Sequence, residues 1–129
     1  MKILLVDDDA NIRTVAVIGL EDEADWEITE ASSGLQALQL SQTNCFDLII
    51  LDMMMPGMDG VTTFGKIREL ENHRQTPIIF MTAKVQKDEI DNYRKLGAMG
   101  VIIKPFDPLS LAEEITQILN LVRPGENRP

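Results

Sequence analysis

The sequence predicts an α/β protein in which helices cover both faces of a single parallel β-sheet. Short apolar runs of strand length alternate five times with stretches whose apolar residues recur at helical spacing. Two of these runs, Leu48–Leu51 and Ile78–Met81, are apolar at every position, as expected of strands buried on both faces. Strands separated by helices pair in parallel through right-handed crossovers, which place helices on both sides of the sheet.

The five predicted strands are short runs that are mostly rich in branched or aromatic residues. They are Ile3–Val6, Trp26–Thr29, Leu48–Leu51, Ile78–Met81 and Val101–Ile103.

The first two helices are predicted from an apolar face and from a cap. The first helix carries its apolar residues on one face: Ile12, Val15, Ala16, Gly19 and Leu20. Ser33 and Gln36 have capping-box spacing and predict the start of the second helix. We expect Leu35 and Leu38 to form its buried side.

The third and fourth helices follow the same period. The third has one apolar face, made by Val61, Phe64 and Ile67. The fourth has another, made by Ile90, Tyr93 and Leu96. Gly97 suits the left-handed turn after a helix and predicts the end of the fourth.

The fifth helix is predicted to begin with Asp107 as its cap and Pro108 at its first helical position. Its inward residues are expected to be Leu111, Ile115, Ile118 and Val122. The segment 123–129 contains two prolines and a glycine and predicts a flexible tail or the start of a linker. A chain of 129 residues fits one domain, so residues 1–122 are expected to form it.

Composition excludes several classes of function. The 21 acidic and 12 basic residues give a net charge of -9, which argues against direct binding to nucleic acid or to an anionic membrane. Cys45 is the only cysteine, so an intramolecular disulfide is impossible, and we expect it to be a small core residue. The apolar stretch after Met1 is too short for a signal peptide or membrane span, which predicts a cytoplasmic location.

Polar groups follow four of the predicted strands at their carboxyl ends. Asp7, Asp8 and Asp9 follow the first strand, Asp52 the third, Thr82 the fourth and Lys104 the fifth. In an open parallel sheet the binding crevice lies beyond these ends, so the side chains are expected to meet there. Gathered carboxylates repel one another unless a cation joins them, and Mg²⁺ fits because it combines a few carboxylates with waters and a phosphate oxygen.

This constellation predicts phosphoryl transfer to a carboxylate. Asp52 is the candidate nucleophile, forming an aspartyl phosphate. Negative charge spreads over the equatorial oxygens in the transition state, where Mg²⁺, the Lys104 ammonium and the Thr82 hydroxyl are the expected stabilising groups.

Four segments, KILLVDDD, DLIILDMMMPGMDG, PIIFMTA and GAMGVIIKPF, resemble the receiver domain of bacterial two-component response regulators, including the chemotaxis receivers. The resemblance covers about residues 2–121. It implies a flavodoxin-like (βα)5 three-layer sandwich with a doubly wound five-stranded parallel sheet in the order 2-1-3-4-5.

The resemblance also implies a role for each site residue. Asp52 would accept the phosphoryl group, and Asp8 and Asp52 would bind Mg²⁺ directly. Asp7 would lie nearby, often bound through water, and the backbone carbonyl of Met54 would be a further ligand. Thr82 would be the switch hydroxyl and Lys104 the ion-pairing partner of the phosphoryl group.

The implied phosphoryl donor is a phosphohistidine on a sensor histidine kinase or a His-phosphotransfer protein. The implied output is a downstream protein effector or a fused output domain, reached through the surface of the last two helices and the last strand. Such a protein is a signalling phosphoacceptor with self-catalysed phosphorylation and autodephosphorylation, rather than an enzyme that turns over a substrate. The family usually has a cis peptide bond before the residue matching Pro105. Many receivers also carry Tyr or Phe at the position of Val101, so the usual rotating aromatic is absent here.

Alternatives remain open at this point. A haloacid-dehalogenase-type phosphatase also uses a strand-end aspartate, but it requires a second aspartate where this chain has Met54. A flavodoxin-like redox protein would need a glycine- and hydroxyl-rich phosphate loop in place of the three acids after the first strand. A pseudo-receiver that binds partners without phosphorylation is the third alternative. Of the three acids, Asp9 is expected only to cap the first helix, and His73 is expected to be an exposed loop residue.

Overall fold

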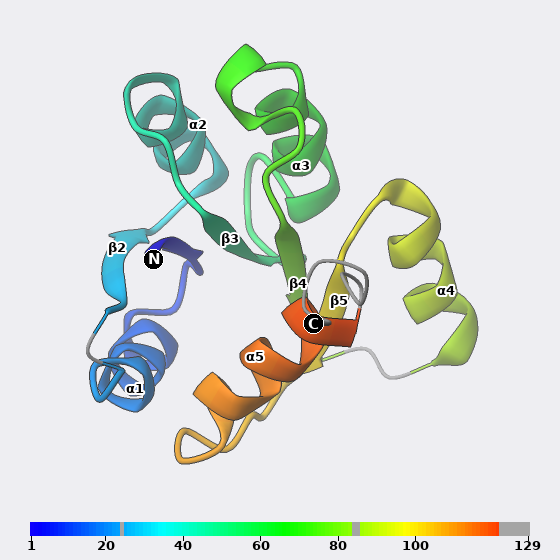
Figure 1. Cartoon of the computed structure of the whole chain (residues 1–129). Coiled ribbons are helices and arrows are strands. Elements are labelled where there is room, and N and C mark those ends of the chain that lie inside the picture. The colour runs from blue at the N-terminus through cyan, green and yellow to red at the C-terminus, as the bar shows by residue number, and fades with distance from the viewer. Residues whose placement is uncertain (24, 84–85, 122–129) are drawn as a thin grey trace, which may run out of the picture.

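The computed structural model describes residues 1–23, 25–83 and 86–121, and it contains one five-stranded parallel sheet (Figure 1). The strand order is β2-β1-β3-β4-β5, as the resemblance implies. The strands are β1 (Lys2–Val6), β2 (Glu27–Ala31), β3 (Leu48–Asp52), β4 (Ile78–Thr82) and β5 (Gly100–Ile103). The predicted tail at 123–129 lies outside the described residues, so the division of the chain at residue 122 stays a prediction.

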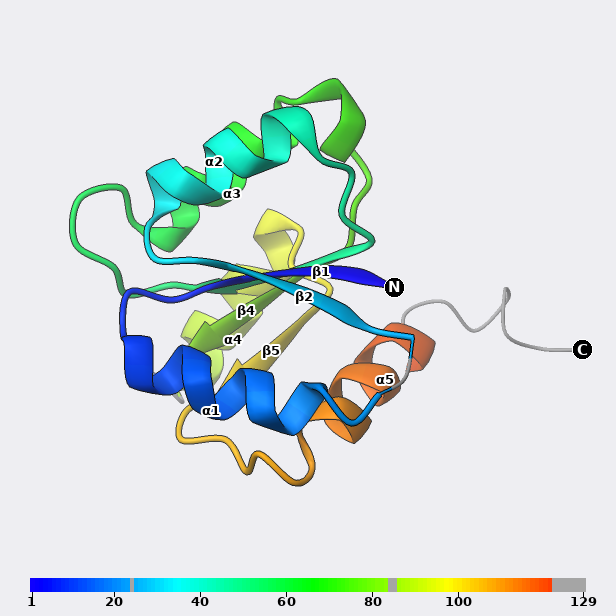
Figure 2. The same cartoon turned by 90° about the vertical axis from the view of Figure 1, so that its left-hand side faces the viewer.

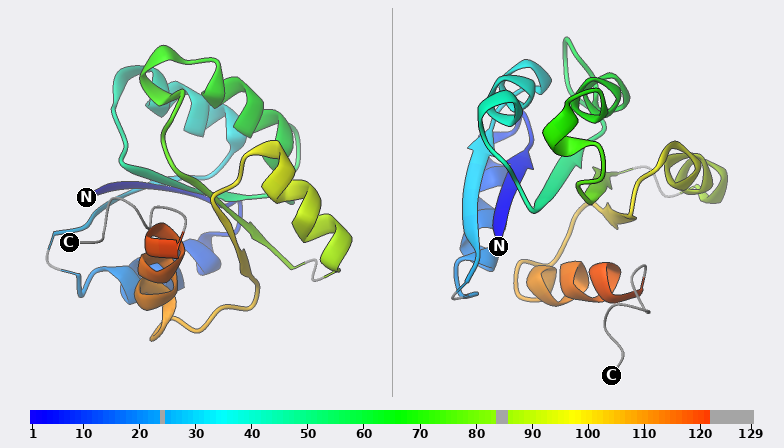
Figure 3. Two further views of the ribbon diagram at one scale, coloured as in Figure 1. Left: turned by 45° about the vertical axis from the view of Figure 1, so that its right-hand side comes forward. Right: turned by 45° about the horizontal axis from the view of Figure 1, so that its top comes forward.

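Helices cover both faces of this sheet. They are α1 (Ala10–Leu20), α2 (Gly34–Thr43), α3 (Gly60–Arg68), α4 (Lys87–Leu96) and α5 (Leu111–Leu121), with a short 3-10 helix η1 (Glu71–His73) before β4. Figures 2 and 3 show α1 and α5 on one side of the sheet and α2 and α3 on the other, with α4 beside β5. The predicted three-layer α/β architecture is therefore confirmed.

The core consists of two apolar clusters, one on each face of the sheet. Alternate residues of one strand enter different clusters, because successive side chains point to opposite faces. On β4, Phe80 belongs to the cluster shared with α2 and α3, whereas Ile79 belongs to the cluster shared with α1 and α5. Thr82 lies two residues beyond Phe80 and therefore faces the same side of the sheet as Phe80.

The strand β2 begins and ends later in the chain than predicted, because its limits are set by pairing with β1. The strand was expected at Trp26–Thr29 but runs from Glu27 to Ala31, in register with Lys2 to Val6. Trp26 instead closes a turn by donating its N–H to the carbonyl of Glu23. Because β2 is an edge strand, its exposed glutamates are compatible with pairing even though they weaken the apolar signal.

Several predicted helix ends are confirmed by their caps. The Asp9 side chain accepts hydrogen bonds from the N–H groups of Asn11 and Ile12, and Ser33 accepts one from Gln36. Gly97 follows α4 with φ of 118°, the left-handed conformation that glycine adopts without a steric penalty. These residues determine where α1 and α2 begin and where α4 ends.

The prediction for the start of α5 was wrong by one turn. Asp107 does act as a cap, but it caps a turn at residues 108–110, where its side chain accepts from the N–H of Leu109, and the helix begins at Leu111. This turn packs closely on α1, since a Cβ on Gly19 would lie 2.4 Å from the carbonyl oxygen of Pro108. Leu111 and Ile115 are buried as predicted, and Val122 lies outside the described residues.

Some apolar residues assigned to buried helix faces are exposed instead. They are Val15, Leu35, Val61 and Leu96. The buried stripe of these helices is therefore narrower than the apolar pattern of their sequence. Cys45 is also exposed, because it belongs to the loop between α2 and β3 and not to a strand or helix.

His73 was predicted to be exposed, and this is wrong. Its ring is fully buried and stacks on Phe46 with 5.9 Å between ring centroids. Nδ1 lies 2.9 Å from Thr76 Oγ1 and Nε2 lies 2.9 Å from the carbonyl oxygen of Asn44. Both ring nitrogens are therefore satisfied inside the protein, which a polar local sequence does not reveal.

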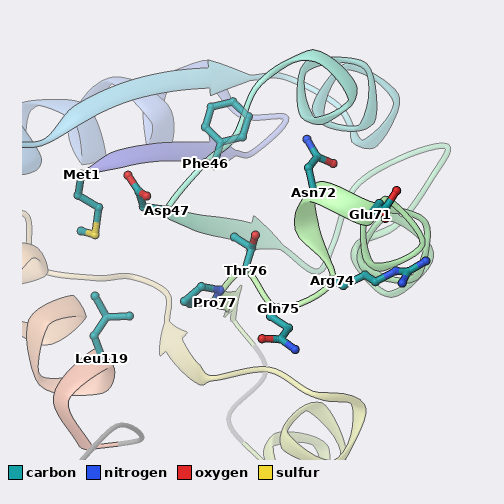
Figure 4. A pocket seen from close by; sticks show the side chains of 10 residues that line it. All are labelled: Met1, Phe46, Asp47, Glu71, Asn72, Arg74, Gln75, Thr76, Pro77 and Leu119. Carbon is teal, nitrogen blue, oxygen red and sulfur yellow. The ribbon is translucent and has the colours of Figure 1, made fainter. Parts of the chain in front are cut away.

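The amino end of the sheet carries a pocket of about 620 Å³ (Figure 4). Phe46 and Asp47 border it before β3, Thr76 and Pro77 before β4, and Leu119 on α5. It lies at the opposite end of the strands from the predicted site. Within the described residues, no helix is both long enough and apolar enough to cross a lipid bilayer.

Candidate phosphoacceptor and metal site

Three carboxylates meet at the carboxyl end of the sheet. Asp7 and Asp8 follow β1, Asp52 is the last residue of β3, and one oxygen from each lies within 4.8 Å of the others. Asp7 and Asp52 are buried, whereas Asp8 is exposed. Carboxylate oxygens are hard donors of the kind Mg²⁺ prefers, and an exposed member leaves access for water and a phosphate oxygen. The residues present therefore fit a magnesium ion.

Lys104 joins two of these acids. Its Nζ lies 2.7 Å from Asp7 Oδ2 and 3.2 Å from Asp52 Oδ1. Burial favours loss of the lysine proton, but the two carboxylates outweigh it and raise the pKa of Lys104 above its usual value. The residue is therefore a cation held between two buried carboxylates.

The carboxyl group of Asp52 has a raised pKa. The pKa of Asp52 is raised from 3.8 to about 6, mainly because the carboxyl group is buried, and the neighbouring charge of Asp7 acts in the same direction. The N–H of Met54, which donates to Asp52 Oδ1 at 3.1 Å, and the Lys104 ammonium act in the opposite direction. Among the described residues, Lys104 is the one lysine paired with these carboxylates, which leaves a deficit of positive charge that a divalent cation would fill.

Thr82 is the last residue of β4 and is fully buried. It directly follows Met81, which pairs with Asp52. Thr82 and Asp52 therefore lie at the ends of two neighbouring strands. Its main-chain carbonyl accepts a hydrogen bond from the Lys104 N–H at 2.8 Å, and the Lys104–Pro105 peptide is cis, as the resemblance implies. The positions of Thr82, Lys104 and Asp52 are therefore coupled through β4 and the end of β5.

Met54 lies in the loop after β3 and is 57% exposed. The role of its carbonyl as a metal ligand stays a prediction. Lys84 lies two residues beyond Thr82, as Met54 lies two residues beyond Asp52, but it is outside the described residues.

Sequence reasoning missed Arg13 as a residue of this site. Its guanidinium Nη1 donates to the main-chain carbonyl of Asp7 at 2.7 Å. The available signal was its position four residues after the cap Asp9, which places it one helical turn above the acidic loop.

A groove of about 420 Å³ adjoins Lys104 on the side of α1. Ile12, Val15, Pro105 and Phe106 border it together with Asn11, Ala83 and Lys104 itself. An apolar surface thus lies directly beside the charged site.

The sheet is doubly wound, and its carboxyl edge carries an acidic pair, a further strand-end aspartate, a threonine and a lysine. This combination defines a receiver of the phosphorelay type. The response regulator receiver domain family matches residues 3–116, and the chain belongs to this family. It is therefore a response regulator receiver, a domain of two-component signalling.

Relatives and solved structures agree with this assignment. The transcriptional regulatory protein SrrA of Staphylococcus aureus is 40% identical over 118 residues, which are 92% of this chain and 47% of SrrA. The chemotaxis response regulator CheY4 of Vibrio cholerae superposes with a TM-score of 0.84 at 32% identity, covering 91% of this chain and 97% of that one. A two-component response regulator from Clostridium difficile gives 0.82 at 28% identity, covering 95% and 98%. The chain spans about half the length of the curated relatives it matches.

Proposed function

We propose that Asp52 is the residue that accepts the phosphoryl group. The observation that carries this is the convergence of Asp7, Asp8 and Asp52, with oxygens within 4.8 Å of one another, around the ammonium of Lys104. We propose Asp8, Asp52 and the Met54 carbonyl as direct Mg²⁺ ligands, with Asp7 binding nearby through water.

In the proposed reaction an oxygen of Asp52 attacks the phosphorus of a phosphohistidine. A P–O bond forms while the P–N bond breaks, and the electron pair returns to the imidazole, which is protonated as it leaves. When bound, Mg²⁺ neutralises charge on the equatorial oxygens. Lys104 turns from the carboxylates toward the new phosphoryl group, and the Thr82 hydroxyl donates a hydrogen bond to it. The chain thereby catalyses its own phosphorylation.

Hydrolysis of the acyl phosphate ends the signal. The side chain of Met54 borders the path by which water reaches Asp52, and its apolar surface is expected to slow that attack. The signal is therefore proposed to be longer-lived than it would be with alanine at position 54.

The proposed donor is a sensor histidine kinase or a His-phosphotransfer protein in the cytoplasm. The groove of Ile12, Val15 and Phe106 lies beside Lys104, so an apolar helical surface carrying the phosphohistidine could dock there and reach Asp52. The chain's net charge of -9 argues against nucleic acid as a direct partner of this domain.

The proposed output surface is α4-β5-α5, read by a protein effector or a fused output domain. Tyr93 on α4 packs edge-on against Phe80, with ring centroids 5.3 Å apart, and both contact the cluster that includes Val101. No residue of α4 is fully buried, so this helix has little apolar attachment to the sheet. We propose that α4 shifts as a unit when Thr82 moves, in place of a rotating aromatic at position 101.

The proposal is tested by incubating the protein with Mg²⁺ and a small phosphoramidate donor, followed by intact mass measurement. One added phosphoryl group is expected, dependent on Mg²⁺ and absent in Asp52→Asn. Asp59→Asn serves as a control, because Asp59 is an exposed cap of α3. Labelling of Asp52→Asn at the wild-type level would refute the assignment, and absence of labelling in the wild type would favour a pseudo-receiver. Turnover of a phosphate ester many times faster than stoichiometric labelling would instead favour the phosphatase, which the matches described above do not support.

A further inference from the structure

Arg13 bonds both to the acidic loop after β1 and to the neighbouring strand β2. Its Nη1 donates to the carbonyl of Asp7 at 2.7 Å, and its Nε lies 3.2 Å from Glu30 Oε1 on β2. The Arg13 side chain is 17% exposed, compared with 46% for Glu30. A largely buried guanidinium that is held by two partners has few alternative positions, so it can act as a rigid support.

The Asp7 main chain is held from opposite directions. Its N–H donates to the carbonyl of Ala31 at 3.1 Å, while its own carbonyl accepts from Arg13. The peptide unit that links Asp7 to Asp8 is planar, so a fixed Asp7 carbonyl also fixes the N–H and the Cα of Asp8. Asp8 is the exposed member of the three carboxylates and has the least packing of its own.

We infer that Arg13 is a positioning residue for the divalent cation, acting through the Asp7 peptide to aim the Asp8 carboxylate at the metal. This inference rests on the proposed function and deepens it, since it names a residue that sets the metal affinity of the same site. Residues that orient metal ligands without touching the metal typically change affinity about 10-fold to 100-fold when they are replaced.

The charge of Arg13 would act in the opposite direction. A guanidinium near a cation site repels the cation, although Glu30 offsets part of this charge. Removing Arg13 should therefore tighten Mg²⁺ binding if charge dominates and weaken it if positioning dominates. The sign of the change separates the two explanations.

The test is a titration of the full chain with Mg²⁺ alone, followed by isothermal calorimetry and by amide chemical shifts. Arg13→Met is expected to raise the Mg²⁺ Kd about 10-fold. Arg68→Met is the matched control, because Arg68 Nη1 also donates to main-chain carbonyls, those of His73 and Thr76, but at the opposite end of the sheet. This control should unfold at a lower temperature and keep the wild-type Kd.

Arg13→Lys keeps the charge but replaces the planar fork by a single ammonium, so its Kd should lie between those of wild type and Arg13→Met. It also decides the question if Arg13→Met does not fold. A Kd in Arg13→Lys equal to that of wild type, or an unchanged or lower Kd in Arg13→Met, would overturn the inference. Normal Mg²⁺-dependent labelling of the wild type beside such a result would leave the proposed function intact. Absence of Mg²⁺ binding by the wild type would overturn both.

Discussion

Replacing Asp52 by asparagine is expected to stabilise the folded protein at neutral pH when no divalent cation is present. The side chain is 2% exposed, and burial is the largest cause that raises the pKa of Asp52 from 3.8 to about 6. The folded state therefore resists ionisation of this carboxyl group more than the unfolded chain does. Asparagine has a similar shape and carries no charge at any pH.

The magnitude follows from the two pKa values. Between about pH 4 and pH 6 the folded protein holds the Asp52 proton while the unfolded chain has lost it, so the free energy of unfolding falls as the pH rises. A pKa displaced from 3.8 to about 6 corresponds to about 3 kcal/mol once both states are ionised. Asp52→Asn lacks this loss, so its advantage over wild type should grow by most of that amount from pH 4 to pH 7.

Urea denaturation in the presence of a chelator, at several pH values, measures this difference. Asp59→Asn is a control of opposite sign, because the hydrogen bond from the Thr62 N–H lowers the pKa of Asp59, whose contribution to stability is lost as the pH falls. Added Mg²⁺ should stabilise wild type and reduce the advantage of Asp52→Asn at pH 7. A difference between Asp52→Asn and wild type that is constant from pH 4 to pH 7 would refute the reasoning.

Two further predictions concern buried polar groups at opposite ends of the sheet. Lys104→Ala leaves the carboxylates of Asp7 and Asp52 facing each other, and urea denaturation without Mg²⁺ should show a loss of about 3 kcal/mol that Mg²⁺ largely restores. Labelling by a phosphoramidate should persist in part in this variant, with smaller amide shifts in α4 than in wild type. His73→Leu leaves the Thr76 hydroxyl and the Asn44 carbonyl without their partner and should lower the free energy of unfolding by about 2–4 kcal/mol. Calorimetry should give His73→Leu the wild-type Mg²⁺ affinity, and a changed affinity would contradict the separation of the two ends.

The layers were predictable because most strands have a clear local sequence signal, whereas the strand order was implied by the family resemblance. The runs that become β3 and β4 are apolar at every position, and such runs fit only strands covered on both faces. The edge strand β2 was placed too early, since its glutamates face solvent and only its pairing with β1 determines its limits. Local pattern therefore locates central strands better than edge strands.

Whether a single side chain is buried or exposed depended on contacts between residues far apart in the sequence. His73 lies in a polar segment, yet it reaches Asn44 across 29 residues of sequence and stacks on Phe46. Cys45 belongs to an apolar residue type, yet it lies in a loop between α2 and β3. Neither outcome follows from local hydrophobicity, because burial is decided by which segments meet.

The candidate site shows the same division between local and distant information. Strand-end carboxylates could be found from sequence because parallel strands bring their carboxyl ends to one edge of the sheet. For Arg13 the sequence offered only its position one helical turn after Asp9, since its bond to the Asp7 carbonyl depends on how α1 lies against β1 and β2. The residues proposed to bind the metal and the phosphoryl group can thus be recognised by their positions at strand ends. The residue proposed to position them can be recognised only by its contact with the main chain. A search for further determinants of metal affinity in this protein should accordingly follow the hydrogen bonds of the β1–α1 peptide units and not the charges in the sequence.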